Sequence, residues 1–71
     1  MSTEEALMVT LIRLIHGAHE VNVYPYHSVD AAQHPMWEVE AKDEDGSMWK
    51  ITSGHRSKAD AMVAALAPPS P

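Results

Sequence analysis

The pattern of apolar and polar residues along the chain begins with a stretch that predicts a helix. Only two of residues 6–15 are polar. A stripe with the i, i+4, i+7, i+8 spacing of one helical face is formed by Leu7, Leu11, Leu14 and Ile15. Ser2 and Glu5 have the spacing of a capping box, and Gly17 is typical of the residue that follows a helix. The pattern predicts a helix over residues 3–16 that is more apolar than packing on one side requires.

Three stretches in the middle of the chain alternate between apolar and polar residues, which is the period of a half-buried strand. The first covers residues 20–27 and contains Pro25. Because proline cannot donate to a central ladder, this strand is expected at an edge of the sheet. The other two strands are predicted over residues 36–42 and 48–53. The polar connection over residues 28–35 is expected to be the most mobile part of the chain.

The second and third strands form a hairpin whose register follows from keeping each face uniform. The preferred register implies a three-residue loop over residues 44–46, in which Gly46 adopts a left-handed conformation. Its cross-strand pairs are Ala41 with Trp49, Glu40 with Lys50, and Val39 with Ile51.

A second helix is predicted to begin after Ser57, a residue type that caps helices. Its inward face is expected to comprise Ala59, Met62, Val63 and Leu66. The predicted fold is therefore α+β, a two-layer α-β-β-β-α sandwich with both helices on one face of a three-stranded antiparallel sheet. One domain is expected over residues 1–67, followed by a flexible proline-rich tail over residues 68–71. The predicted core brings together Trp37, Val39, Trp49, Ile51, Leu11, Leu14, Val63 and Leu66.

The length and composition of the chain exclude several classes of function. The chain has 71 residues, no cysteine, ten acidic and five basic residues, and a formal net charge of −5. Disulfides and thiolate chemistry are excluded, and a domain of this size has little room for a closed active site. We expect no enzymatic activity, no catalytic residue and no cofactor. No apolar stretch approaches a membrane-spanning length and no targeting signal is recognisable, which favours a cytoplasmic protein without membrane contact.

The C-terminal third contains a motif of a known family. Gly54, Ser57, Lys58 and Ala61 match parts of the run Gly-x-Gly-x-Ser-Lys-Lys-x-Ala-Lys, and the chain thereby resembles double-stranded-RNA-binding domains. The strand pattern over residues 37–41 and the pair His34-Pro35 are similar to that family as well. The resemblance implies the same α-β-β-β-α order. It also implies a degenerate RNA surface, because two of the three lysines are replaced, by Ala59 and Met62.

Two surfaces are candidates for binding. Tyrosine and methionine interleaved with charges suit a protein contact, and the outer sheet face carries Tyr24, Tyr26, Met36, Glu38, Glu40, Met48 and Lys50. The start of the last helix favours anions through its free backbone N–H groups, and a candidate anion or nucleic-acid contact there comprises His55, Arg56 and Lys58. The ordinary alternatives are a solvated amphipathic sheet and surface residues of a turn.

Histidine and acidic side chains are the candidate metal ligands of a chain without cysteine. His16 and His19 are three residues apart and Glu20 follows, a spacing that could chelate zinc. Gly17 interrupts the helix between the two histidines, so surface histidines are the favoured interpretation and no metal site is predicted. The acids of residues 43–45 lack the spacing of a calcium loop and are interpreted as solvated turn residues.

These observations favour a small non-catalytic protein-interaction module that binds a protein partner or a second copy of itself. Its contacts would come from the outer sheet face or from the apolar excess of the first helix. One alternative is a weak RNA binder that uses the start of the last helix, although specific duplex binding is not expected at physiological salt. Another is an acidic phage-type inhibitor or nucleic-acid mimic that offers Glu38, Glu40, Asp43, Glu44 and Asp45 to a basic cleft.

Overall fold

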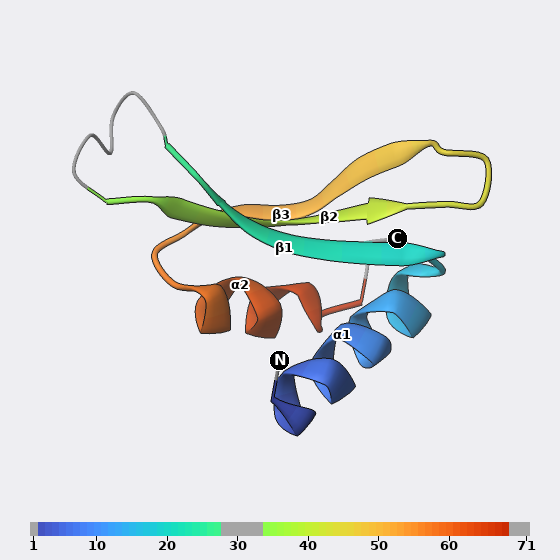
Figure 1. The fold of residues 1–71 in the computed structure, drawn as a ribbon, viewed down its shortest axis with the longest axis horizontal. Helices are drawn as coiled ribbons and strands as arrows, with labels where there is room; N and C mark the ends of the chain where they lie inside the picture. Colours follow the sequence, from blue (N-terminus) through green and yellow to red (C-terminus); the bar gives the residue numbers. More distant parts are fainter. Residues whose placement is uncertain (1, 28–33, 69–71) are drawn as a thin grey trace.

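A computed structural model describes residues 2–27 and 34–68 of the chain. The elements are α1 (Thr3–His16), β1 (Glu20–Tyr26), β2 (Met36–Lys42), β3 (Met48–His55) and α2 (Lys58–Ala65). The strands form one antiparallel sheet in the order β1-β2-β3, and both helices lie on the same side of it (Figure 1). The predicted fold class and element order are confirmed. Most of the connection predicted to be mobile and the tail beyond Pro68 lie outside the described residues.

Both ends of α1 are capped by the predicted residues. The Ser2 hydroxyl accepts a hydrogen bond from the Glu5 amide at 3.2 Å. At the other end Gly17 has φ 64°, and the next amide, that of Ala18, donates to the Arg13 carbonyl at 2.9 Å. Glycine adopts this left-handed conformation without the steric cost that a Cβ imposes. The chain can therefore turn directly from α1 into β1.

The hairpin register agrees with the prediction near the turn and departs from it further along. Glu40 lies opposite Lys50, and Gly46 has φ 93°, as predicted. A shift in the ladder next to Val39 then places this residue opposite Thr52. The predicted pairing of Val39 with Ile51 is wrong because a bulge inserts an extra residue into β3, which an argument from uniform alternation does not foresee.

The core lies between the middle of the sheet and α2. Its buried residues are Ile12, Val39, Ala61, Met62 and Ala65. Trp37, Ile51 and Leu66 are half-buried against this cluster, in line with the prediction. Small alanine side chains let the backbone of α2 approach the sheet closely. The face that α2 buries is therefore centred on Ala61 and Ala65, two residues outside the predicted stripe.

Four residues that the sequence placed in the core are exposed instead. They are Leu11, Leu14, Trp49 and Val63. Trp49 retains 37% of its accessible surface, because it lies near the hairpin end of the edge strand β3. Val63 and Ala59 are on the side of α2 that faces away from the sheet. The two exposed leucines belong to a larger apolar surface on α1.

Candidate interaction surfaces

The most exposed apolar surface of the described chain follows one side of α1. Leu7 and Leu14 keep 58% and 65% of their accessible surface. Leu11 lies between them and is also exposed, and Ile15 is exposed at the edge of the stripe. We call these four residues the leucine face. Contiguous apolar surface of this kind is characteristic of contact sites rather than of an ordinary solvated helix.

The leucine face points away from the protein because α1 packs with its opposite side. Ile12 is fully buried, and Val9 is half-buried against the core. Glu5 and His16 belong to the same side of the helix and reach α2. The Glu5 carboxylate lies 2.9 Å from Lys58 Nζ, and His16 Nε2 lies 2.8 Å from the Ala65 carbonyl oxygen. Four contacts at i, i+4, i+7 and i+11 fix the rotation of the helix.

The direction of α1 adds to this exposure. Its C-terminal end lies next to β1, whereas the helix slants away so that its N-terminal end is far from the sheet (Figure 1). The first two turns of α1 therefore lie away from the strands (Figure 1). Sequence periodicity could not show this, since α1 is apolar on more than one side and either side fits a buried stripe. The positions of Glu5 and His16 were the available signal, because both find partners on α2.

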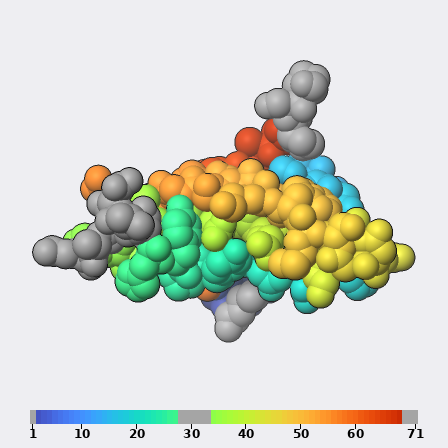
Figure 2. Space-filling model, turned by 90° about the horizontal axis from the view of Figure 1, so that it is seen from above, coloured from blue at the N-terminus to red at the C-terminus, as the bar shows by residue number. Residues whose placement is uncertain are grey.

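The outer face of the sheet, predicted as a protein-contact surface, is occupied by a polar cluster. β2 lies between β1 and β3 on this face (Figure 2). Glu38 on β2 is only 7% exposed, and its Oε2 atom lies 3.3 Å from Lys50 Nζ on β3. From β1, the Tyr24 hydroxyl donates to Glu40 Oε2 at 3.2 Å. Most of the polar groups proposed for a partner thus interact with one another.

Both tyrosines of β1 are engaged, Tyr24 with this cluster and Tyr26 with the backbone of β3. Removal from water raises the pKa of Tyr24 to about 12, with further contributions from a hydrogen bond to Glu38 and from the charges of Glu38 and Glu40. The Tyr26 hydroxyl accepts a hydrogen bond from the Gly54 amide at 3.1 Å. Met36 is half-buried, and Met48 is exposed at the hairpin end of β3. Among the apolar side chains that the described residues place on this face, that of Met48 next to the hairpin is the most exposed.

The predicted anion site at the start of α2 has its main cation already paired. Lys58 forms the ion pair with Glu5 described above. His55 Nε2 lies 2.6 Å from the Thr52 hydroxyl, and Arg56 is exposed. The Glu5 carboxylate beside Lys58 offsets its charge and repels a phosphate that approaches it. This pairing weakens the site in addition to the two missing lysines.

Met62 shows why the lysines of the RNA-binding motif cannot all be restored by substitution. It stands at the position of the third lysine in the family motif, and it is 2% exposed in contact with the core. A lysine there would bury its charge without a partner. Ala59, at the position of the second lysine, is exposed and could accept one. The start of α2 therefore retains the capping part of the motif but not its cationic surface.

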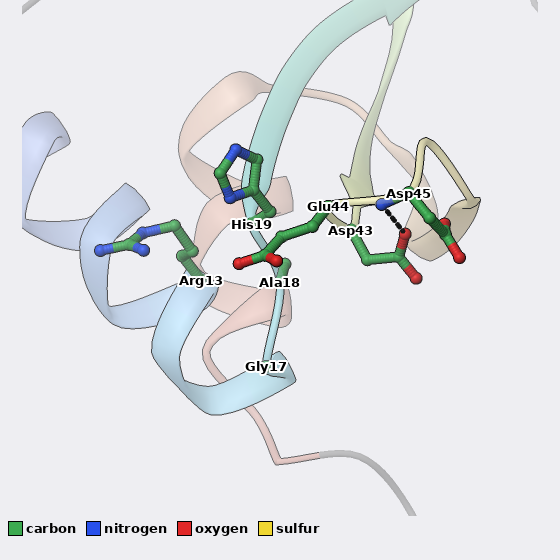
Figure 3. A pocket seen from close by; sticks show the side chains of 7 residues that line it. All are labelled: Arg13, Gly17, Ala18, His19, Asp43, Glu44 and Asp45. Atoms are coloured by element: carbon green, nitrogen blue, oxygen red, sulfur yellow. Dashed lines mark hydrogen bonds between the residues drawn. The ribbon is translucent and has the colours of Figure 1, made fainter.

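A shallow, open cleft of about 450 Å³ lies between the α1–β1 corner and the hairpin tip. Arg13 and His19 line one side, and Asp43, Glu44 and Asp45 line the other. Glu44 extends toward the corner, whereas the carboxylates of the two aspartates point away from it (Figure 3). The cleft has a mixed, mainly acidic lining and no deep apolar wall.

The two aspartates of this cleft are used by the turn itself. Asp43 Oδ1 accepts hydrogen bonds from the Asp45 and Ser47 amides at 3.1 and 3.2 Å. The Ser47 amide also donates to Asp45 Oδ1 at 2.8 Å. A hydrogen bond with the Asp43 side chain, together with the donors of Ser47, lowers the pKa of Asp45 to about 2. The same interaction with Asp45, and partial removal from water, raise the pKa of Asp43. Their arrangement supports the interpretation of these acids as turn residues.

The histidines do not converge on one site. His16 is directed to the end of α2, and His19 lines the cleft. The neighbouring Glu20 accepts a hydrogen bond from the Asn22 side chain at 3.2 Å. Within residues 2–27 and 34–68, no group of three or more histidine or acidic side chains is placed to hold a metal ion.

Comparisons with known proteins do not supply a relative. No protein-family model, no curated protein and no solved structure matches the chain. In the described part of the chain, neither helix is long and apolar enough to cross a membrane. The α-β-β-β-α order remains compatible with the double-stranded-RNA-binding arrangement suggested by the motif.

Proposed function

We propose that this protein is a non-catalytic protein-interaction module, built on a degenerate version of the double-stranded-RNA-binding fold, that contacts its partner through the leucine face of α1. The observation that carries the proposal is the exposure of Leu7, Leu11 and Leu14 on the side of α1 opposite its packing side. Solvated helices gain nothing from three such leucines, whereas a partner that covers them removes apolar surface from water.

The other surfaces support binding less well. The outer sheet face has Glu38 buried and Tyr24 engaged with Glu40. An acidic inhibitor would lose the use of the two aspartates that hold the hairpin turn. RNA binding through α2 would compete with the pairing of Lys58 to Glu5. On each of these surfaces, side chains needed for binding already interact within the protein. The exposed leucines of the leucine face are not needed for any of these interactions.

A capture experiment with matched variants tests the proposal. The protein is immobilised through a C-terminal tag and exposed to extract from its source cells, in parallel with a Leu7→Gln, Leu11→Gln, Leu14→Gln triple variant. The control is Met48→Gln, which changes a side chain 57% exposed on a different surface. We expect a protein that the native chain and the control retain and that the triple variant loses. Equal retention by all three forms would contradict the proposal.

A duplex-RNA shift assay tests the alternative. At a salt concentration of about 150 mM we expect no shifted band at micromolar protein, because phosphate contacts are few and salt weakens them steeply. Ala59→Lys adds one exposed cation at the start of α2. If the fold presents α2 to a duplex as the family does, this variant should bind better at low salt. Micromolar binding by the native chain at about 150 mM salt would favour RNA as the ligand.

A further inference from the structure

The leucine face has a spacing that is complementary to itself. Leu7, Leu11 and Leu14 are separated by four and three residues, the alternation found along a coiled-coil seam. Reversing the helix direction exchanges these intervals. A second α1 lying antiparallel would therefore place Leu7 beside Leu14 of the copy, with the two Leu11 side chains next to each other at the centre. One patch would serve both subunits, as a twofold interface requires.

We infer that the leucine face pairs with the leucine face of a second copy, so that two antiparallel α1 helices form a homodimer. The inference rests on the proposed function, since it names the partner of the same surface. Ile15 lies beside the stripe and extends the apolar contact. Because the opposite side of α1 already packs on α2 through Ile12 and His16, pairing requires no rearrangement of either subunit.

The distribution of charge favours a second copy despite the net charge of −5. Many of the acids lie elsewhere, at the hairpin tip over residues 43–45 and on the outer sheet face at Glu38 and Glu40. The exposed residues that flank the leucines within α1 include the uncharged Ala6 and Thr10 and, in the first turn alone, the charged Glu4. The leucine face can therefore approach its copy without bringing clusters of like charge together.

Charges at the helix ends favour the antiparallel orientation. The first turn of α1 carries Glu4, which lies on the same side of the helix as Leu7 and Leu11, whereas Glu5 and His16 are on the opposite side and contact α2. An antiparallel pair keeps the two Glu4 side chains apart, and it opposes the two helix dipoles. A parallel pair would instead place the two Glu4 side chains together. The orientation is thus a specific part of the inference.

The contact surface is small, and this sets the expected affinity. Four partly exposed side chains per subunit provide less area than the roughly 1,200 Å² typical of a stable interface. We expect a reversible dimer with a dissociation constant on the order of 10–100 μM. Since each copy carries the same net charge, screening should strengthen the dimer as salt rises. A basic partner on this face would show the opposite salt dependence.

Sedimentation equilibrium from about 5 to 500 μM protein tests the inference at low and high salt. We expect the average mass to rise from monomer toward dimer, with a lower dissociation constant at high salt. The triple leucine variant should raise the dissociation constant at least tenfold, while Met48→Gln leaves it unchanged. Circular dichroism confirms that each variant is folded. A dimer that the triple variant retains would overturn the inference, because another surface would then hold the copies together.

Engineered cysteines test the orientation, since the native chain has none that could interfere. Under mild oxidation Leu11→Cys should form a disulfide-linked dimer readily, because the two positions lie close to the twofold axis. Leu7→Cys should cross-link with Leu14→Cys in a mixture more than with itself. Ser47→Cys, on the exposed hairpin, is the control and should remain mainly unlinked. Preferential linkage of Leu7→Cys to itself would indicate parallel helices and overturn the inference.

The failures of the two proposals are distinguishable. A chain that stays monomeric at about 500 μM, but captures another protein through the leucine face, overturns the homodimer and leaves the proposed function standing. Self-association that depends on the leucines supports both. Absence of both self-association and leucine-dependent capture overturns both.

Discussion

Helices α1 and α2 lie on the same face of one sheet, yet the longer and more apolar helix contributes less to the core. α1 has 14 residues and one buried side chain, Ile12. α2 has eight residues and buries Ala61, Met62 and Ala65. The difference arises from distance, because α2 runs beneath the sheet whereas α1 slants away from it (Figure 1).

This comparison shows that apolar content alone does not determine which helix a small domain buries. Alanines allow α2 to approach the sheet, and the space that remains beside it accommodates one side of α1. The other side of α1 retains leucines that the fold does not use. An unused apolar surface costs solubility, so a binding role explains its presence better than a structural one does.

The largest effect should come from truncating the side chain that α2 buries most deeply. Met62→Ala removes the largest buried side chain of α2 and leaves a cavity among Ile12, Val39 and Ala65. We expect it to lower the free energy of unfolding by about 2–5 kcal/mol, a large part of the stability of a domain this small. Urea denaturation measures the change. A loss below about 1 kcal/mol would mean that α2 is not the helix that anchors the core.

A smaller loss of stability is expected from substituting the residue that ends α1, because the two helices end in different conformations. α1 ends at Gly17 with φ 64°, whereas α2 ends at Leu66 with φ −73°. Gly17→Ala forces a Cβ into a left-handed conformation and should cost about 1–2 kcal/mol. Gly17→Asn serves as the matched control, since asparagine tolerates this conformation better. Equal stability of the alanine variant and the native chain in thermal unfolding would contradict the observed cap.

The ion pair that joins the helices should contribute less still. Glu5 and Lys58 are both partly exposed, and exposed pairs typically give couplings of about 0.2–1 kcal/mol. A double-mutant cycle with Glu5→Gln and Lys58→Met should give a coupling within this range that falls as salt is added. No coupling even at low salt would indicate that the N-terminal half of α1 is not held against α2.

The sequence was sufficient to predict the helices and strands, but not which face of each one is buried. Capping residues marked both ends of α1, and alternation located the strands, because these signals act within a few residues. Whether Leu14 or Ile12 turns inward depends on how α1 crosses α2, which no local pattern contains. The exposure of Trp49 depends likewise on its place at the hairpin end of an edge strand.

The sequence likewise located the candidate site residues but not the long-range contacts that decide whether their side chains are free to bind. The family motif located the cap at Ser57 but could not show that Glu5, more than fifty residues away, neutralises Lys58. Strand alternation assigned Glu38 to the outer face, yet its burial depends on Tyr24 and Lys50 from the neighbouring strands. The sequence showed that α1 has more apolar residues than packing on one side requires. The packing of α1 on α2 was needed to show which of these side chains are exposed to solvent.

The central claim is that the leucine face belongs to the surface and not to the core. The most direct test is the free energy of unfolding of the Leu7→Gln, Leu11→Gln, Leu14→Gln variant, measured by urea denaturation at about 1 μM, where the chain is monomeric. Because the three side chains are exposed and glutamine is a good helix former, we predict a change of no more than about 1 kcal/mol. A loss of several kcal/mol, comparable to that of Met62→Ala, would show that these leucines hold the fold together and would contradict the account.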